Sequence, residues 1–377
     1  MKNILITGGA GFIGSNLALK LIEKGYKITV LDNLSKQIHG ENPEETSPLF
    51  KSIKDQVTFI EGTVTSKEDW KKALENQHII VHFAAETGTG QSMYCIEKYT
   101  EVNIQGTAIM LDLLANSKNI VEKIVIASSR SIYGEGKYKH PDLGIVYPSH
   151  RKEKDMLAGN FELTYRDNEI LELLATDEES KIHPSSVYGI TKQNQEQMIM
   201  TVCPTLGIAP VGFRYQNVYG PGQSLSNPYT GILSIFSTQI RNNNPLQIFE
   251  DGKETRDFVF IDDVVNATIH GIEKDAANGN VYNVGTGVAT NVLEVANSLI
   301  KAYNINVPVT VTGRFRLGDI RHNFADLTKI KKHLGFEPTV YFKEGIQMFS
   351  DWVLQQEIQE DNLSRSLEEM KKKGLLK

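Results

Sequence analysis

Apolar residues in the first 130 positions form short runs that alternate with stretches of helical spacing. The runs predict strands and the spaced stretches predict helices, which is the pattern of parallel strand–helix–strand units. A run such as Ile4-Leu5-Ile6 is apolar throughout, as expected of a strand covered on both faces of its sheet. The predicted strands are residues 3–7, 27–31, 57–61, 79–84 and 123–127, and the predicted helices are residues 13–24 and 96–115. We therefore expect an α/β fold built on a doubly wound parallel sheet.

The region from residue 135 to 184 breaks this alternation, because it is polar, rich in charge and only weakly periodic. So long an irregular stretch indicates a functional flap or an insertion, in which we expect one or two helical turns at residues 170–175. Regular signals return as helices at residues 186–200, 262–272 and 292–303 and as strands at residues 209–214, 246–249, 256–260 and 281–284. Residues 351–377 predict a charged C-terminal helix that faces solvent.

Length and composition limit what the chain can be. Its 377 residues exceed the ~250–300 that one core usually holds, so we expect a smaller C-terminal α/β lobe beside the sheet domain. The formal net charge of -6 gives no basic field for nucleic acid, and no run reaches the ~18–20 apolar residues of a membrane span. The two cysteines, Cys95 and Cys203, predict neither a disulfide framework nor a cysteine metal site. We expect a cytoplasmic protein.

Glycines recur between the first predicted strand and the first predicted helix, at Gly8, Gly11 and Gly14. Gly8 allows a tight turn, Gly11 lets the backbone approach a pyrophosphate, and Gly14 lets the helix pack close to the sheet. The free N–H groups at the start of that helix attract the phosphates of a dinucleotide. Asp32 ends the second strand, where a carboxylate accepts both hydroxyls of the adenosine ribose and repels a 2′-phosphate. The turn therefore predicts a Rossmann-type site for NAD rather than NADP.

Tyr188 and Lys192 are four residues apart in a predicted helix and so share one of its faces. A free tyrosine is a poor base at neutral pH, and a nearby ammonium lowers its pKa. Ser129 follows the fifth predicted strand, at the edge of the sheet where ligands bind in open parallel sheets. Its hydroxyl can hydrogen-bond the substrate oxygen whose proton Tyr188 removes, and Lys192 can also hold the nicotinamide ribose. We predict that these three residues are catalytic.

In their order along the chain, these motifs resemble those of the extended short-chain dehydrogenases/reductases, within the NAD-dependent epimerase/dehydratase family. The resemblance spans roughly residues 1–350 and rests on TGGAGFIG at 7–14, HFAA at 82–85, the Ser129 segment, the Tyr188–Lys192 pair, RYQNVYGPG at 214–222, RDFV at 256–259 and RLGD at 316–319. It implies an NAD-binding domain over residues 1–213 that contains the insertion, a mainly sugar-nucleotide-binding lobe over residues 214–350, and a C-terminal helix over residues 351–377. Segments 262–272 and 281–284 are expected to return to the NAD-binding domain.

The resemblance also implies which residues hold each ligand, and it implies no metal. The cofactor site would include Gly8, Gly11, Phe12, Ile13, Gly14, Asp32, Asn33, Thr63, Val64, Phe83, Ala84, Ala85, Asn103, Tyr188 and Lys192. The substrate site would include Gly88, Gln91, Tyr94, Ser129, Arg130, Asn217, Arg256, Arg316 and Asp319. Asn217 and the arginines at 256 and 316 would hold the diphosphate, since guanidinium forks suit phosphate oxygens. Thr63 departs from the family, which has an aspartate on the adenine there, and this puts that contact in doubt.

Arg130 and Ser131 distinguish among the reactions of the family. Members that remove water carry an Asp-Glu pair at these positions and related decarboxylases keep the Glu, whereas this chain has no carboxylate at either. The chemistry that remains, hydride transfer with one proton shuttle, fits a nucleotide-sugar 4-epimerase that oxidises C4 to a ketone and reduces it from the opposite face. Two other interpretations stay open, namely a one-way sugar-nucleotide dehydrogenase or reductase, and a non-catalytic dinucleotide-sensing protein.

Segments 31–40, 86–94 and 133–138 are similar to the dTDP-L-rhamnose 4-epimerase group, which also carries a long insertion before the Tyr188 motif. A 4-epimerase of UDP-glucose or UDP-N-acetylglucosamine is the alternative. Family members commonly dimerise through two long helices, here residues 96–115 and 186–200, so the resemblance implies a homodimer. The expected partners are thus a nucleoside-diphosphate sugar and a second copy of the chain, with neither nucleic acid nor a membrane. The expected activity is that of an isomerase in carbohydrate metabolism.

Overall fold

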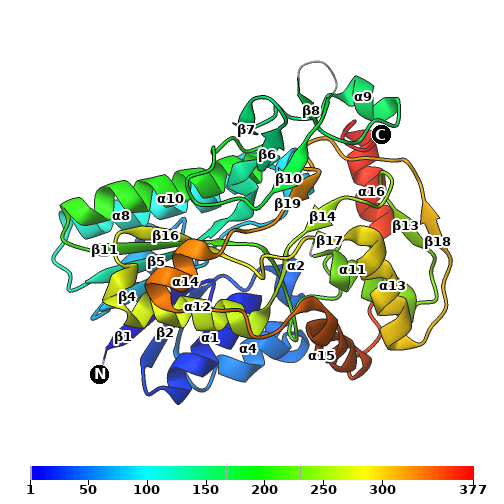
Figure 1. Ribbon diagram of the computed structural model, residues 1–377. Helices are drawn as coiled ribbons and strands as arrows, with labels where there is room; N and C mark the ends of the chain where they lie inside the picture. The colour runs from blue at the N-terminus through cyan, green and yellow to red at the C-terminus, as the bar shows by residue number, and fades with distance from the viewer. Residues whose placement is uncertain (1, 166–168, 230) are drawn as a thin grey trace.

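A seven-stranded parallel sheet forms the centre of the computed structural model, which describes residues 2–165, 169–229 and 231–377 (Figure 1). Its strand order is β16-β11-β5-β4-β1-β2-β3, and every neighbouring pair runs parallel. The strands are β1 (Asn3–Thr7), β2 (Lys27–Asp32), β3 (Thr58–Glu61), β4 (Ile79–His82), β5 (Lys123–Ser129), β11 (Ala209–Tyr215) and β16 (Asn280–Val284). The predicted doubly wound α/β fold is confirmed.

Alternate residues of the strands pack into two apolar clusters, one on each face of the sheet. Ile4 and Ile6 of β1 join one cluster, whereas Leu5 joins the other. All three side chains are fully buried, which explains why this strand is apolar at every position. The cluster with Ile4 and Ile6 lies beneath α1 (Phe12–Glu23), α4 (Pro48–Ile53) and α12 (Ile261–Glu273), and the cluster with Leu5 lies beneath α5 (Lys67–Ala73), α8 (Gly106–Asn116) and α10 (Val187–Thr205). Figure 1 shows α1, α4 and α12 on one face of the sheet and α8 and α10 on the other.

The helix predicted over residues 96–115 is interrupted in the structure. It consists of α7 (Ile96–Tyr99), a π-helical turn (Thr100–Gln105) and α8. The wider turn carries the fully buried Asn103, whose side chain receives a 2.8 Å hydrogen bond from the Glu86 N–H and donates one of 2.9 Å to Thr191 Oγ1. This amide therefore ties the segment after β4 to α10.

The inserted segment, residues 135–184, has regular structure of its own. It contains β6 (Lys137–His140), β7 (Gly144–Val146), α9 (Glu153–Leu157), β8 (Thr164–Tyr165), β9 (Glu169–Ile170) and β10 (Glu172–Leu174). The prediction of helical turns at residues 170–175 is wrong, because β10 pairs antiparallel with β6 in a three-stranded sheet of order β10-β6-β7. The alternate residues Leu171 and Leu173 pack on Tyr138 in a small core, which a strand allows and a helix would not.

The rest of the chain forms the C-terminal lobe and further elements of the sheet domain. Strand β16 pairs with β11 at the edge of the central sheet, and α12 packs against α1. Helix α14 (Thr328–Leu334) packs against β16 and so also belongs to the sheet domain. The lobe itself contains β12 (Asn217–Tyr219), α11 (Ile232–Arg241), β13 (Leu246–Ile248), β14 (Thr255–Arg256), β15 (Phe258–Phe260), β17 (Thr290–Asn291), α13 (Val292–Tyr303), β18 (Val309–Val311), β19 (His322–Asn323) and α15 (Phe342–Leu354). The domain boundary placed between residues 213 and 214 stays a prediction.

Residues 351–377 do not form the single solvated helix that was predicted. Helix α15 ends at Leu354, and a second helix, α16 (Leu363–Lys372), follows after a short connection. Leu363, Leu367 and Met370 recur on one face of α16 and pack with Tyr94 and Phe249, so this face is buried rather than solvated. Among the described residues, no helix has both the length and the apolar character needed to cross a membrane.

Candidate functional site

A cleft of about 1310 Å³ runs along the carboxyl ends of the sheet strands, from the glycine turn to the C-terminal lobe. A pocket for one drug-sized ligand is typically about 300–1,000 Å³. The cleft therefore has room for a dinucleotide together with a second ligand. Its position at the carboxyl ends of parallel strands is where ligands bind in open α/β sheets.

The glycine turn between β1 and α1 forms one end of the cleft. Gly8 has a φ of +68°, and a Cβ atom there would lie only 2.8 Å from the main-chain nitrogen of Ala84. Gly11 precedes α1 in an extended conformation, and no side chain caps the helix. The first N–H groups of α1 therefore face the cleft side of the turn without a competing side chain, a cradle that fits a pyrophosphate. The residues present fit the expected NAD.

Asp32 ends β2 and lines the cleft beside this turn. Its carboxylate accepts hydrogen bonds of 3.0 Å from the Ala10 N–H and 2.9 Å from the Leu34 N–H. Burial raises the pKa of Asp32, and these N–H groups together with His39 oppose the rise. His39 lies 3.9 Å from the carboxylate through Nε2, and its Nδ1 is 2.8 Å from Ser47 Oγ. The predicted ribose-binding residue Asp32 is thus supported by His39 and Ser47, which the sequence argument missed.

The three predicted catalytic residues meet in the cleft. Ser129 is the last residue of β5, and Tyr188 and Lys192 lie on the first two turns of α10. Ser186 caps this helix by accepting a 3.1 Å hydrogen bond from the Gly189 N–H. Lys192 Nζ donates a 2.9 Å hydrogen bond to the carbonyl oxygen of Ala127 in β5. The cap and this bond fix the start of α10 against the end of β5.

Burial dominates the electrostatics of these residues. It raises the pKa of Tyr188, and the Ser129 hydroxyl and the charge of Arg130 oppose the rise. Burial also lowers the pKa of Lys192 to about 7. The pKa of Arg130 falls to about 9, through burial and the nearby Arg256. The charge of Arg130 is therefore one positive charge that favours the Tyr188 phenolate. The same effect of Lys192 stays a prediction.

Thr63, which departs from the family pattern, lines the cleft next to Val64. Its hydroxyl is 3.0 Å from Thr65 Oγ1, and its main-chain N–H donates a 3.0 Å hydrogen bond to Asp69 Oδ2. The hydroxyl is thus engaged by its neighbour. The remaining predicted cofactor residues that line the cleft are Phe12, Ile13, Gly14, Asn33, Phe83, Ala84 and Ala85.

The predicted diphosphate arginines lie on the lobe side of the cleft. The Arg256 guanidinium donates hydrogen bonds of 2.8 to 2.9 Å to the carbonyl oxygens of Thr255, Ile320 and Arg321. Arg316 pairs with Asp319 at 2.7 Å and lies over the ring of Phe249 at 5.3 Å. Main-chain carbonyls therefore hold the guanidinium of Arg256 in the cleft wall, and the Asp319 carboxylate holds that of Arg316.

Several polar atoms in the same wall have no hydrogen-bond partner within the described part of the chain. They are the side-chain atoms Gln216 Nε2 and Oε1, Asn217 Oδ1, Gln223 Oε1 and Glu254 Oε2, all buried. Their residues all line the cleft. Buried polar groups in native proteins almost always have partners, so this wall fits a polar ligand.

Three predicted contact residues lie behind the cleft rather than in its lining. Asn103 is buried in the π-helical turn, where it holds Glu86 and Thr191. Gln91 contacts the cleft residue Gln37 through side-chain hydrogen bonds of 3.3 and 3.4 Å. The Tyr94 hydroxyl is 2.8 Å from that of Tyr229, which lines the cleft. Gly88 does line the cleft, as predicted.

Several stretches of the lining were missed by the sequence argument, and two of them contact each other. One is the loop after β12, of which Pro221 to Tyr229 line the cleft, and the other is α16, which contributes Leu363 and Met370. Tyr229 joins the two by donating a 2.8 Å hydrogen bond to Glu369. The spacing of Leu363, Leu367 and Met370 at intervals of four and three is the signal that could have revealed the buried face of α16.

The histidines of the insertion have protein partners. Nδ1 of His140 accepts from the N–H groups of Asp142 and Leu143 at 3.1 and 3.3 Å, and Nε2 lies 3.0 Å from Glu169. His140, Asp142 and Glu169 lie close enough together to share an ion, but the two acidic residues are exposed. His150 stacks on His183 at 5.5 Å. Through these contacts, the histidines connect different parts of the insertion.

Comparison with known proteins agrees with this geometry. The family model described as "NAD dependent epimerase/dehydratase family" matches residues 4–151 and 165–285. A dTDP-L-rhamnose 4-epimerase from Burkholderia thailandensis is 35% identical over 94% of this chain and 96% of its own length. The structure of a Thermotoga maritima UDP-glucose 4-epimerase with UDP-glucose has a TM-score of 0.74 and 28% identity, covering 94% of this chain and 99% of that one.

A second solved structure bears on the cofactor. The UDP-glucuronic acid 4-epimerase of Bacillus cereus, in complex with UDP-glucuronic acid and NAD, has a TM-score of 0.76 and 25% identity. The match covers 94% of this chain and 99% of that chain. Together with the glycine turn and Asp32, these matches identify NAD as the cofactor. The chain belongs to the NAD-dependent epimerase/dehydratase family.

Proposed function

We propose that this protein inverts the configuration at C4 of a nucleoside-diphosphate sugar. The observation that carries the proposal is the meeting of Ser129, Tyr188 and Lys192 in one cleft, with Arg130 and Ser131 at the positions where a dehydratase needs carboxylates. The similarity to named 4-epimerases supports it. Because a carboxylic acid is the usual group for protonating a departing hydroxyl, water loss is disfavoured here.

Each catalytic residue has a role in this reaction. NAD, when bound, supplies the group that accepts a hydride from C4 and gives it back. Tyr188 as phenolate takes the proton of the C4 hydroxyl while Ser129 donates a hydrogen bond to the same oxygen, so a 4-keto sugar forms. Tyr188 then returns the proton to that oxygen as C4 is reduced on the opposite face. Arg130 stabilises the Tyr188 phenolate by its charge. Lys192 holds the nicotinamide ribose, and so the nicotinamide, next to C4 of the sugar.

The lobe side of the cleft would hold the diphosphate and the base. Arg256 and Arg316 supply the positive charge. The Gln216 amide supplies a donor and an acceptor, and the side-chain oxygens of Asn217 and Gln223 supply further acceptors. We propose dTDP-L-rhamnose as the substrate, on the strength of the Burkholderia thailandensis relative. A UDP-sugar stays the alternative. A cytoplasmic location and a homodimer formed through α8 and α10 remain predictions.

The proposal is tested by incubating the purified protein with dTDP-L-rhamnose, UDP-glucose and UDP-N-acetylglucosamine in turn. NMR of the sugar protons reports inversion at C4, and absorbance reports reduced nicotinamide in solution. A 4-epimerase gives the C4 epimer of one of these sugars with no build-up of free NADH. Steady NADH formation would instead identify a dehydrogenase, and no turnover with any of the three would contradict the proposal.

A further inference from the structure

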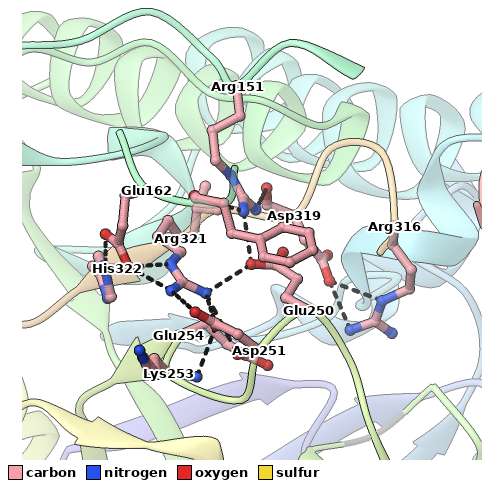
Figure 2. Close-up of polar contacts among 12 residues, drawn as sticks. Arg151, Glu162, Glu250, Asp251, Lys253, Glu254, Arg316, Asp319, Arg321 and His322 are labelled. Atoms are coloured by element: carbon pink, nitrogen blue, oxygen red, sulfur yellow. Dashed lines mark hydrogen bonds and ion pairs between the residues drawn. The ribbon is translucent and has the colours of Figure 1, made fainter. Parts of the chain in front are cut away.

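The insertion reaches the lobe side of the cleft through a buried cluster of charges (Figure 2). At its centre, Glu250 Oε2 accepts hydrogen bonds of 2.7 Å from Arg151 and 2.9 Å from Arg321. We propose that these three residues, here called the brace, position the nucleotide-binding wall of the cleft, so that the insertion determines how tightly the nucleoside diphosphate binds. This inference rests on the proposed function.

Glu250 is the member of the brace that lines the cleft. Its φ of +49° lies in the left-handed region, which is unfavourable for a residue with a Cβ atom. Its side chain is 6% exposed, and both guanidinium groups reach the same carboxylate oxygen. A strained backbone persists only where its surroundings hold it. The two arginines therefore hold Glu250, and the turn that it belongs to, in the cleft wall.

Arg151 is the only member of the brace that comes from the insertion, and it makes a second contact with the wall. Its Nη2 donates a 2.9 Å hydrogen bond to the carbonyl oxygen of Asp319. The next two carbonyls along the chain, those of Ile320 and Arg321, accept from the guanidinium of Arg256. Arg151 thus fixes the segment that orients Arg256 and carries Asp319, although it does not itself line the cleft.

Arg321 is fully buried and connects the brace to further carboxylates. It pairs with Asp251 at 2.7 Å and with Glu162 of the insertion at 2.5 Å, and its main-chain N–H donates to Glu135 at 2.7 Å. Glu135 in turn lies 3.4 Å from Arg151 Nε. Each buried charge therefore has a partner of opposite sign, and removing one leaves another unpaired, which is costly. The insertion and the lobe are held in one arrangement by this network.

The brace has contacts with the lobe and the insertion but not with the glycine turn or Asp32. A positioning role therefore predicts weaker nucleoside-diphosphate binding with unchanged NAD binding, whereas general destabilisation weakens both. Arg151→Met removes both wall contacts. Arg151→Lys keeps the charge without the fork and should recover part of the affinity. The exposed Lys139 of β6, which pairs with Glu172 at 3.8 Å, gives the matched control Lys139→Met.

The test is calorimetric titration of UDP and of dTDP into the NAD-loaded wild type and variants. We expect Arg151→Met to lower the affinity for the nucleotide that the wild type binds by about 10- to 100-fold. The NAD affinity of Arg151→Met should be unchanged, and the control Lys139→Met should bind both ligands like the wild type. In turnover by Arg151→Met, KM should rise while kcat stays within about threefold of the wild type. Equal loss of NAD and nucleotide affinity, or a lower melting temperature with no loss of nucleotide affinity, would overturn the inference.

A second variant tests the contribution of the Glu250 carboxylate apart from the conformation of its backbone. Glycine adopts the left-handed conformation freely, so Glu250→Gly removes the carboxylate without straining the turn. We expect the same loss of nucleotide affinity as for Arg151→Met, and little further loss in the double variant, because the two residues act as a pair. Wild-type nucleotide affinity in Glu250→Gly would overturn the proposed role of the brace. Nucleotide binding by a wild type that inverts no sugar would reject the proposed epimerisation alone, and a wild type that binds neither nucleotide would overturn both.

Discussion

Lys192 donates a 2.9 Å hydrogen bond from its ammonium to the carbonyl oxygen of Ala127, two residues before Ser129. This single bond joins the second turn of α10 to the end of β5. It brings the face of α10 that carries Tyr188 to the point where the sheet presents Ser129. The meeting of Ser129, Tyr188 and Lys192 is therefore a consequence of how one helix packs across one strand. Substitutions at these positions should separate chemistry from binding.

Replacing Tyr188 by phenylalanine should remove the proton shuttle and leave the cofactor in place. General acid–base groups contribute roughly 10²- to 10⁴-fold to rate, and we expect kcat to fall by that order. Bound NAD, measured after denaturing the purified variant, should match the wild type, because the glycine turn and Asp32 are intact. The exposed Tyr341 provides the control Tyr341→Phe. Near-normal turnover by Tyr188→Phe would show that another group is the base.

Asp32→Ala should relax the discrimination between NAD and NADP. The substitution removes the carboxylate that repels a 2′-phosphate, and it also removes the acceptor for the Ala10 and Leu34 N–H groups. A hydrogen bond to a charged group contributes about 1.5–3 kcal/mol, so NAD affinity should fall roughly tenfold or more. Titration with both dinucleotides measures the effect, with exposed Asp55→Ala as the control. An unchanged preference for NAD would argue against the ribose role.

Glu254 makes the stability of the protein depend on pH. Burial raises the pKa of this carboxyl to about 7, although Arg256 opposes the rise. At a pH below the ordinary pKa range of a carboxyl, Glu254 is neutral in both the folded and the unfolded protein. As the pH rises toward 7 the unfolded chain ionises first, so the folded state loses stability relative to it.

Glu254→Gln should therefore gain free energy of unfolding over the wild type between about pH 5 and pH 7, by at most about 1.4 kcal/mol per pH unit. Urea unfolding at both pH values measures this difference, and the same substitution at exposed Glu179 is the control. A difference between Glu254→Gln and wild type that does not vary with pH would contradict the assignment.

Elements whose signal is local could be predicted from the sequence. The strand at Asn3–Thr7 agrees with its predicted bounds, and β2, β5 and α13 agree to within two residues, because each is an unbroken apolar run or a clean helical period. That Ser129, Tyr188 and Lys192 share one cleft with most of the predicted cofactor residues could be predicted because their motifs lie next to such elements. The π-helical turn at Thr100–Gln105 has no comparable signal in the sequence. Its apolar residues keep the spacing of an α-helix, so the sequence predicts one continuous helix there.

Features that depend on distant partners could not be predicted in this way. Arg321 is fully buried, yet its partners Asp251 and Glu162 lie 70 and 159 residues away along the chain. Strand β10 is decided by pairing with β6, and the buried face of α16 by packing near the cleft. Gln91 and Tyr94 were placed at the sugar from their position after β4, but Gln37 and Tyr229 stand in front of them.

In the proposed reaction, C4 is oxidised and then reduced by the same hydride. The most direct measurement uses a nucleotide sugar deuterated at C4, converted in ordinary water by the protein as purified. A hydride that is removed and returned within the cleft never meets solvent, so we predict that the epimer keeps deuterium at C4 by NMR and mass spectrometry. Hydrogen from solvent at C4 of the product would contradict the proposed hydride transfer, because it would show inversion by proton exchange at carbon.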